Sequence, residues 1–298
     1  MMVEEENIYR NVRSLRERSP VHDLQGSDKI VVVSDLHMGD GSYNDDFRKT
    51  SEIFTNAFEK FYLDRGFRLV LNGDVEELLK FRVKRIMDRW RDIYSLFERF
   101  QDEIGLYKIL GNHDWDFGLN VLHDRIERQF EAVRFKLLEG ELFFLHGHQG
   151  SHWLERLHNV NKVLLRNVIS PLKLRNFALT LDHKPVTRKE HRLSRYANMD
   201  RILTFMGHTH RPLFGSHDGV PGLFNSGAAI GRRGITTLEI EGGFINLVHW
   251  WGRDLVKRYL KMDWFDPERL KGTDIYRVVL NRANLSDVFG EQAPARSF

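Results

Sequence analysis

Five short polar segments, each placed directly after an apolar run, most strongly constrain how this chain of 298 residues can fold. A short apolar run that ends in such a segment is typical of a buried β-strand. A ligand that follows a strand is aimed from a rigid base, so several strand ends can serve one site. The segments are Asp35-Leu36-His37, Gly73-Asp74, Gly111-Asn112-His113-Asp114, His146-Gly147-His148 and Gly207-His208-Thr209-His210. We therefore expect five strand ends to converge on one polar site.

The residue types in these segments suit a pair of divalent metal ions. Carboxylate and amide oxygens are ligands for hard ions, and imidazole is a ligand for borderline transition metals. Asp35 and His37 stand two residues apart, so both side chains can face one ion if strand geometry continues. Asp74 is a single carboxylate in a glycine turn, which suits a bridge between two ions. The predicted ligands are Asp35, His37, Asp74, Asn112, His146, His208 and His210.

The sequences DLH, GDVEE, GNHD, HGH and GHTHRP occur in this order between Val31 and about Trp250, and they resemble the five blocks of the calcineurin-like metallophosphoesterases. The resemblance implies one metal held by Asp35, His37, Asp74 and His210, and a second held by Asp74, Asn112, His146 and His208. It also implies that Asp74 bridges the ions together with a water or hydroxide, which attacks the phosphorus in line. Mn²⁺ is the expected metal, although Fe, Zn²⁺, Ni²⁺ and Co²⁺ tolerate the same ligands.

The resemblance assigns roles to residues beside the ligands as well. His113 is the expected catalytic residue, which donates to a transition-state oxygen or to the leaving group. Asp114 is expected to orient and charge the imidazole of His113, as carboxylates often do for functional histidines. His148 and Arg211 are candidate contacts of the substrate phosphate.

The order of elements predicts the fold class. Strands alternate with helical patterns and are followed after His210 by strands alone, which favours an α/β (α+β) fold with two sheets packed face to face. The resembled family has this architecture, a four-layer αββα sandwich. We expect an N-terminal helical arm over residues 1–28, a metallophosphoesterase domain over 29–252 and a C-terminal extension over 253–298.

Apolar spacing gives more local expectations. It predicts one long helix over about 75–102, and we interpret Glu76 and Glu77 as acids of its first turn. It also predicts a helix over about 119–130 and a strand near 275–280.

Residues 151–200 form an insertion between the HGH and GHTH blocks, with ten Lys and Arg against four Asp and Glu. Two interpretations stay open: amphipathic helices packed on the core, or a helical cap with a basic rim over the metals. An insertion here is similar to the helical lid of UDP-2,3-diacylglucosamine pyrophosphohydrolases, which cleave a lipid A precursor. That family generally has an arginine and an acid at the places of His113 and His148. The cap interpretation makes Arg166, Arg175 and Arg188 candidate substrate contacts.

These observations predict a dinuclear metal-dependent phosphoesterase, which hydrolyses a phosphodiester or pyrophosphate bond of a small or lipid-linked substrate, such as a UDP-2,3-diacylglucosamine-like pyrophosphate. A nuclease or cyclic-nucleotide phosphodiesterase of the same fold is the alternative, since the basic run Arg82–Arg91 could follow a phosphate backbone. Such a run is more often a solvated helix face, so nucleic acid is not the expected partner. A metal-free scaffold is disfavoured because the ligand set is intact.

Composition adds an expectation about location. Cysteine is absent from the chain, which fits a reducing compartment. The sequence has no run of about 18 apolar residues, and its first residues lack an apolar signal core. We therefore expect a cytoplasmic protein, with peripheral contact to the inner membrane face through the basic cap.

Overall fold

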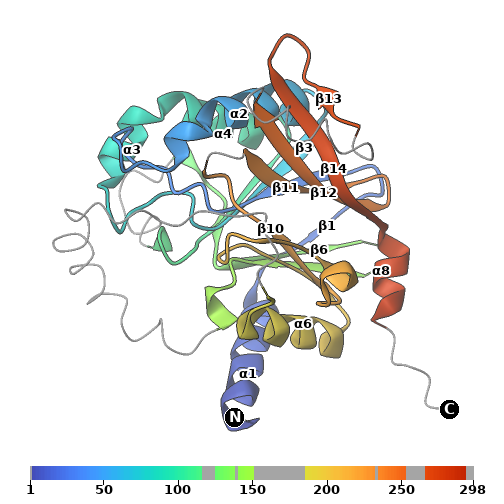
Figure 1. Ribbon diagram of the computed structural model, residues 1–298. Helices are drawn as coiled ribbons and strands as arrows, with labels where there is room; N and C mark the ends of the chain where they lie inside the picture. The colour runs from blue at the N-terminus through green and yellow to red at the C-terminus, as the bar shows by residue number, and fades with distance from the viewer. Residues whose placement is uncertain are drawn as a thin grey trace.

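Two β-sheets pack face to face, and helices cover both outer faces (Figure 1). The computed structural model describes residues 2–115, 125–137, 140–150, 185–231, 234–252 and 266–292. Three groups of buried apolar side chains lie between the successive layers. The expected four-layer sandwich is therefore confirmed.

The larger sheet has eight described strands and carries the first half of the predicted site. Its strands, in spatial order, are β13 (Glu268–Arg269), β14 (Ile275–Asn284), β12 (Phe244–Gly252), β11 (Ile235–Glu241), β2 (Lys29–Val33), β3 (Phe67–Asn72), β4 (Leu106–Ile109) and β5 (Gln129–Phe130). Strands β2, β3 and β4 are parallel neighbours, with Val32 opposite Val70 and Val70 opposite Tyr107. Because parallel neighbours end at the same edge, the segments that follow these strands lie together.

The smaller sheet has six described strands and carries the rest of the site. Their order is β1 (Val21–Asp23), β6 (Ala132–Lys136), β7 (Glu141–Leu145), β8 (Leu203–Met206), β10 (Leu223–Ser226) and β9 (Pro212–Phe214). Strands β7 and β8 are also parallel neighbours. Buried residues of the two sheets, among them Val32, Val70, Phe144 and Phe205, form the core between them. This core fixes the edges of the two sheets relative to each other.

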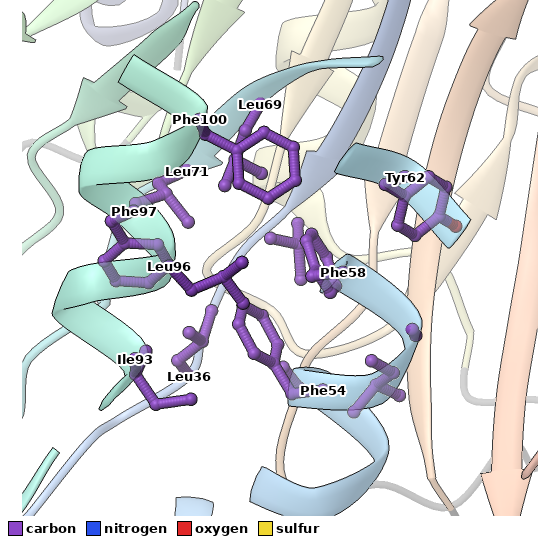
Figure 2. Close-up of a cluster of buried hydrophobic side chains, with 14 of the residues drawn as sticks. Leu36, Phe54, Phe58, Tyr62, Leu69, Leu71, Ile93, Leu96, Phe97 and Phe100 are labelled. Carbon is purple, nitrogen blue, oxygen red and sulfur yellow. The ribbon is translucent and has the colours of Figure 1, made fainter. Parts of the chain in front are cut away.

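Helices rich in aromatic residues cover the outer face of the larger sheet. They are η1 (Phe47–Lys49), α2 (Ser51–Ala57), the π-helical turn η2 (Phe58–Leu63), α3 (Val83–Arg89) and α4 (Arg91–Glu103). Figure 2 shows Phe54, Phe58, Phe97 and Phe100 in one buried cluster with Leu71 of β3. Phe54 and Phe58 stack with ring centroids 4.0 Å apart. This apolar layer supports the strands from behind.

The predicted long helix over 75–102 is wrong in two places. Residues 75–82 are not helical, and α3 and α4 are separate helices that meet at Trp90, whose φ of −109° and ψ of 35° break the helix. The indole Nε1 of Trp90 donates to the carbonyl of Gly39 and to Asp45. These bonds hold the break in place. The predicted helix over 119–130 is wrong at Gln129–Phe130, which forms β5, and residues 119–124 lie outside the described residues.

Two helices cover the smaller sheet, α1 (Met2–Arg18) and α6 (Arg188–Asp200). The apolar stripe Ile8, Val12 and Leu15 of α1 is buried together with Leu193 and Tyr196 of α6. Helix α6 is therefore part of the outer layer of the sandwich, although its residues were expected to belong to the cap. The remainder of the expected cap, residues 151–184, lies outside the described residues.

The C-terminal residues extend the same architecture. The predicted strand near 275–280 is confirmed as part of β14, which pairs with β12. Helix α8 (Leu285–Glu291) follows and buries Leu285 and Val288 against the core between the sheets. None of the helices in the described part of the chain is long and apolar enough to cross a membrane.

Candidate metal centre

All seven predicted ligands follow the ends of β2, β3, β4, β7 and β8, as the sequence predicts. Backbone hydrogen bonds continue the pairing beyond the strands and hold the ligand segments together. The N–H of Asp35 donates to the Gly73 carbonyl, and that of His37 donates to the Asp74 carbonyl, both at 3.0 Å. In the smaller sheet, Gly207 N–H donates to the His146 carbonyl at 2.9 Å. The ligands are thus placed by main chain that is itself fixed.

Most of the predicted ligands have a left-handed backbone conformation, which is unusual for residues other than glycine. Among the described residues, six that are not glycine have a positive φ. One of them, Arg201, ends α6 in the left-handed conformation. The other five are predicted ligands: Asp35 (55°), His37 (46°), Asp74 (53°), His208 (67°) and His210 (55°). A left-handed residue costs about 1–2 kcal/mol. Such strain is typical of sites where side-chain placement matters more than local stability.

The first group of ligands gathers around Asp35. Its Oδ1 lies 3.1 Å from Nε2 of His210 and 3.8 Å from Nε2 of His37. The two imidazole Nε2 atoms lie 3.0 Å apart. The other oxygen, Oδ2, accepts hydrogen bonds from Ser34 Oγ and from the His208 N–H. One side of the carboxylate is therefore anchored, while the other side faces the two imidazoles.

The second group gathers around Asp74, whose carboxylate is arranged in the same way. Oδ1 accepts a hydrogen bond from the His113 N–H at 2.8 Å. Oδ2 lies 3.0 Å from Nε2 of His146 and 4.0 Å from Nε2 of His37. Ligand atoms of Asp74, His146 and His208 all lie within 4.8 Å of one another. Because Oδ2 faces histidines of both groups, Asp74 has the position of a bridging ligand.

Two glycines allow this close approach. A Cβ at Gly111 would lie 2.1 Å from Oδ1 of Asp74, and a Cβ at Gly73 would lie 2.2 Å from Nδ1 of His146. Gly73 also has a φ of 90°, which side chains rarely adopt. Nδ1 of His146 lies 2.9 Å from the Asn72 carbonyl oxygen. That contact places a proton on Nδ1 and leaves Nε2 as the atom that faces the site.

Unpaired atoms show that the residues fit metal ions. Asp35 Oδ1, Asn112 Oδ1 and His146 Nε2 are buried and make no satisfactory hydrogen bond within the described residues. Buried polar atoms normally have partners. Here oxygen atoms of Asp74 and Asp35 lie 3.0 Å and 3.1 Å from imidazole nitrogen atoms of His146 and His210. Atoms that converge on a common point in this way are suited to hold a cation, and the donor set matches a dinuclear divalent centre.

Charge in the metal-free site is balanced between acids and histidines. Burial alone would raise the pKa of Asp74, but the nearby His146 and His113 hold it well below its ordinary value. Burial alone would lower the pKa of His146, but Asp74 and Asp35 raise it to about 9. Burial, together with the charges of His146 and Lys189, lowers the pKa of His208 well below its ordinary value. The acids are thus ready to bind cations, and His208 is neutral.

His113 lies at the solvent-accessible side of the cluster, but its carboxylate partner is not the expected one. Its side chain is 21% exposed, while that of Asp74 is 2% exposed. Nδ1 of His113 lies 2.8 Å from Oε1 of Glu77. Nε2 lies 3.9 Å from Oδ2 of Asp74. Glu77 therefore has the orienting position that the sequence assigned to Asp114.

Asp114 instead supports the loops that carry the ligands. Its carboxylate accepts hydrogen bonds from the N–H groups of Gly111 and Val75, and lies 3.8 Å from Nζ of Lys108. Lys108 also pairs with Glu76, and all three charged side chains are fully buried. The interpretation of Glu76 and Glu77 as first-turn acids is wrong, because this stretch is not helical and both side chains are buried.

The residues predicted to contact the substrate lie in different surroundings in the structure. The ring of His148 lies 5.7 Å from that of His146, beside the cluster. The guanidinium of Arg211 pairs with the buried Glu190 of α6, so the structure gives it a role in joining α6 to the ligand loop. Arg188 is exposed at the first residue of α6. Arg166 and Arg175 lie outside the described residues.

Sequence reasoning missed two residues at this site, Glu77 and Lys189. Glu77 follows Asp74 by three residues, and this closeness to a predicted ligand is the signal that the sequence offers for it. Lys189 has its Nζ atom 3.1 Å from Nε2 of His208, although the two residues are 19 positions apart. Lys189 lies in a segment rich in Lys and Arg, so no sequence pattern distinguishes it from the neighbouring basic residues.

Comparison with known proteins gives a family assignment. A family profile described as the calcineurin-like phosphoesterase superfamily domain matches residues 29–241. No curated protein matches the chain. Vacuolar protein sorting 29 from Cryptosporidium parvum has 14% identity over 76% of this chain and 92% of its own, with a TM-score of 0.42. A dimetal phosphatase from Danio rerio has 11% identity over 74% and 95%, with a TM-score of 0.37. These two likenesses are too weak to support an argument about function.

Proposed function

The chain belongs to the calcineurin-like phosphoesterase superfamily, and on that premise we propose that it hydrolyses phosphodiester or pyrophosphate bonds with two divalent metal ions. The observation that carries the proposal is the convergence of six of the predicted ligands, of which Asp35, His37 and Asp74 are strained and almost fully buried. Structural packing alone gives no reason to keep such strain. A metal centre that requires fixed ligand positions does.

When bound, the pair of ions supplies Lewis-acid activation of the phosphoryl group and of the attacking water. The chain provides the rest. Asp35 and Asp74 each have one oxygen anchored by hydrogen bonds, so each can turn only its other oxygen toward a cation. The anchoring fixes the separation of the two ligand groups, and that separation controls how a phosphate is oriented.

His113 is the proposed proton donor to the leaving group. Glu77 holds its Nδ1 and offsets the charge that the ring gains when Nε2 also carries a proton. Nε2 is left to face the phosphate from the solvent-accessible side. Burial alone would raise the pKa of Glu77, but the contacts with His113 and His37 hold it well below its ordinary value. Glu77 therefore stays anionic during the reaction.

The substrate proposal is a phosphate diester or pyrophosphate with a large group beyond the phosphorus, such as a UDP-2,3-diacylglucosamine-like pyrophosphate. Its support is the basic composition of residues 151–200, which begin directly after η5 (His148–Gly150) and continue into α6 beside the metal ligands. A lipid-linked substrate would bring the protein to a membrane surface. Mn²⁺ is the proposed ion in vitro, since it accepts both oxygen and imidazole ligands.

A substrate screen tests this proposal. Wild-type protein loaded with Mn²⁺ would be assayed on bis(p-nitrophenyl) phosphate, nucleoside-diphosphate sugars, UDP-2,3-diacylglucosamine, cyclic nucleotides and single-stranded DNA. Hydrolysis that depends on metal and disappears in Asp74→Ala supports the proposal. Absence of metal-dependent turnover of every phosphodiester and pyrophosphate in the screen contradicts it.

The structure also indicates which residues to replace in order to test whether the substrate is large. Helix α6 is part of the outer layer of the sandwich, so only residues 155–184 should be replaced by a Gly/Ser linker, with α6 left intact. Binding energy from remote parts of a substrate helps large substrates and does not affect small ones. We expect the replacement to spare bis(p-nitrophenyl) phosphate and to weaken turnover of the large pyrophosphate. An unchanged preference would remove the support for a large substrate.

A further inference from the structure

The beginning of α6 is fixed to the metal-ligand loop by one buried carboxylate. Thr187 caps the helix and forms a capping box with Glu190. Glu190 is fully buried, accepts a hydrogen bond from Thr209 Oγ1 at 2.8 Å and pairs with Arg211. Thr209 lies between the predicted ligands His208 and His210. The backbone of the first turn of α6 therefore has a fixed position relative to these ligands.

Lys189 is in that first turn, and its ammonium group faces the cluster. Nζ lies 3.1 Å from Nε2 of His208, and the side chain is half-buried. No carboxylate within the described residues forms an ion pair with Lys189, whereas Arg211, in the same loop as His208, is neutralised by Glu190. The site thus contains a half-buried lysine whose described partner is the imidazole of a predicted metal ligand.

This arrangement is incomplete without an anion. Divalent ions bound by Asp74, His146 and His208 would repel an ammonium held against the same imidazole. Helix α6 is anchored, so the backbone of Lys189 stays beside the site, and its flexible side chain can turn toward an anion bound there. A phosphate oxygen beside His208 would bind both the metals and the ammonium, and lysine is a common phosphate ligand.

We propose that Lys189 is a substrate-binding residue, whose ammonium donates to a non-bridging phosphate oxygen on the His208 side of the metal centre. The inference rests on the proposed function and names a residue of that same site. Lys189 and His113 contact different ligands, since the His113 ring lies 4.6 Å from that of His37. The two donors would therefore hold different oxygens of one phosphate, and Lys189 would stabilise charge while His113 transfers the proton.

The experiment compares Lys189→Met, which removes the charge but keeps the length, with Lys189→Arg, which keeps the charge. Arg195→Met is the matched control, because Arg195 lies on the same helix and pairs with Glu5 at the surface. Metal content, affinity of the Mn²⁺-loaded protein for inorganic phosphate by calorimetry, and kcat and KM for bis(p-nitrophenyl) phosphate would be measured for each. The calorimetry reports on Lys189 even if no tested ester is hydrolysed.

We expect Lys189→Met to keep two metals and to bind phosphate about 10- to 100-fold more weakly, the usual loss for a charged hydrogen bond. Its turnover should fall, Lys189→Arg should recover much of both properties, and Arg195→Met should match the wild type. Loss of metal from Lys189→Met would overturn the proposal and make Lys189 a support for His208. Unchanged phosphate affinity, or no phosphate binding by the wild type, would also overturn it. Phosphate binding that depends on Lys189 without turnover of any ester would reject the proposed hydrolase function alone.

Discussion

One carboxylate, that of Glu77, joins His113 to the metal ligand His37. Its Oε1 lies 2.8 Å from Nδ1 of His113, and its Oε2 lies 3.3 Å from Nδ1 of His37. Burial alone would lower the pKa of His37, but contacts with Asp35 and Glu77 raise it well above its ordinary value. Orientation of the proposed proton donor and orientation of a ligand therefore depend on the same side chain.

Replacing Glu77 tests this link. Glu77→Gln keeps the shape but removes the charge, so we expect both metals to bind and kcat to fall by about 10- to 100-fold, as is common for such supporting partners. The alkaline limb of the pH–rate profile should move as well, because a proton donor must be protonated to act and the charge beside His113 has changed. Asp114→Asn is the comparison, since its carboxylate does not contact His113. If Asp114→Asn moves the profile and Glu77→Gln does not, the assignment of Glu77 is wrong.

His113 itself should be needed for chemistry more than for metal binding. We expect His113→Asn to retain two metals and to lower kcat by about 10²–10⁴, the range for a positioned proton donor. The loss should shrink for p-nitrophenol esters, whose leaving group needs no proton. Rates with nitrophenyl and alkyl leaving groups would be compared. An equal loss for both classes would leave His113 as a stabiliser of charge only.

The ligands were predictable because their signal is local. Each follows an apolar run, so residues such as Asp35 and Asp74 are marked by their immediate neighbours. The partner of His113 was not predictable in this way. Apolar spacing suggested a helix from residue 75, whereas the chain first crosses the site in an extended stretch, with Met38 bridged to Glu76. That stretch is held by backbone hydrogen bonds from Met38 to Val75 and from Glu77 to Met38, and no local rule connects these distant segments.

The partner of Arg211 was not predictable for a related reason. The resemblance made Arg211 a candidate contact of the substrate phosphate. The structure instead pairs it with Glu190, which lies 21 residues earlier on α6. Sequence spacing cannot show that a buried acid on another element neutralises a cation. Lys189 was missed for the same reason, because sequence spacing does not show which side chains of other elements lie beside it. Only the structure shows that it has no carboxylate partner among the described residues.

Metal affinity should rise with pH. The pKa of His146 in the metal-free protein is raised to about 9, so its imidazole is protonated at neutral pH and must lose that proton to bind a metal. The ion pair with Asp74 stabilises the metal-free fold fully below pH 6.5, and this stabilisation is lost as the pH rises through about 9. Calorimetry of Mn²⁺ binding at pH 7.5, in buffers of different ionisation enthalpy, should reveal proton release. Binding without proton release would contradict these charges.

The buried ion pairs of Lys108 with Glu76 and Asp114 should contribute strongly to the free energy of unfolding. Lys108→Met leaves the carboxylates of Glu76 and Asp114 without their cation in a fully buried setting. Breaking one partner of such a pair costs about 3–5 kcal/mol. Lys29→Met is the control, because its pair with Glu241 is partly exposed and should cost no more than about 1 kcal/mol. Urea unfolding of the metal-free variants would give both values. Equal losses of unfolding free energy in Lys108→Met and Lys29→Met would show that the buried ion pairs contribute no more than a partly exposed pair.

The most direct test counts metal ions in the wild type and in Asp74→Ala. Asp74 is the one predicted ligand whose carboxylate oxygen faces histidines of both groups. We expect two Mn²⁺ per wild-type chain by elemental analysis after desalting, with hydrolysis of bis(p-nitrophenyl) phosphate. Asp74→Ala should bind one ion or none and lose nearly all turnover. Two ions at full occupancy in Asp74→Ala, with activity close to that of the wild type, would contradict the dinuclear centre described here.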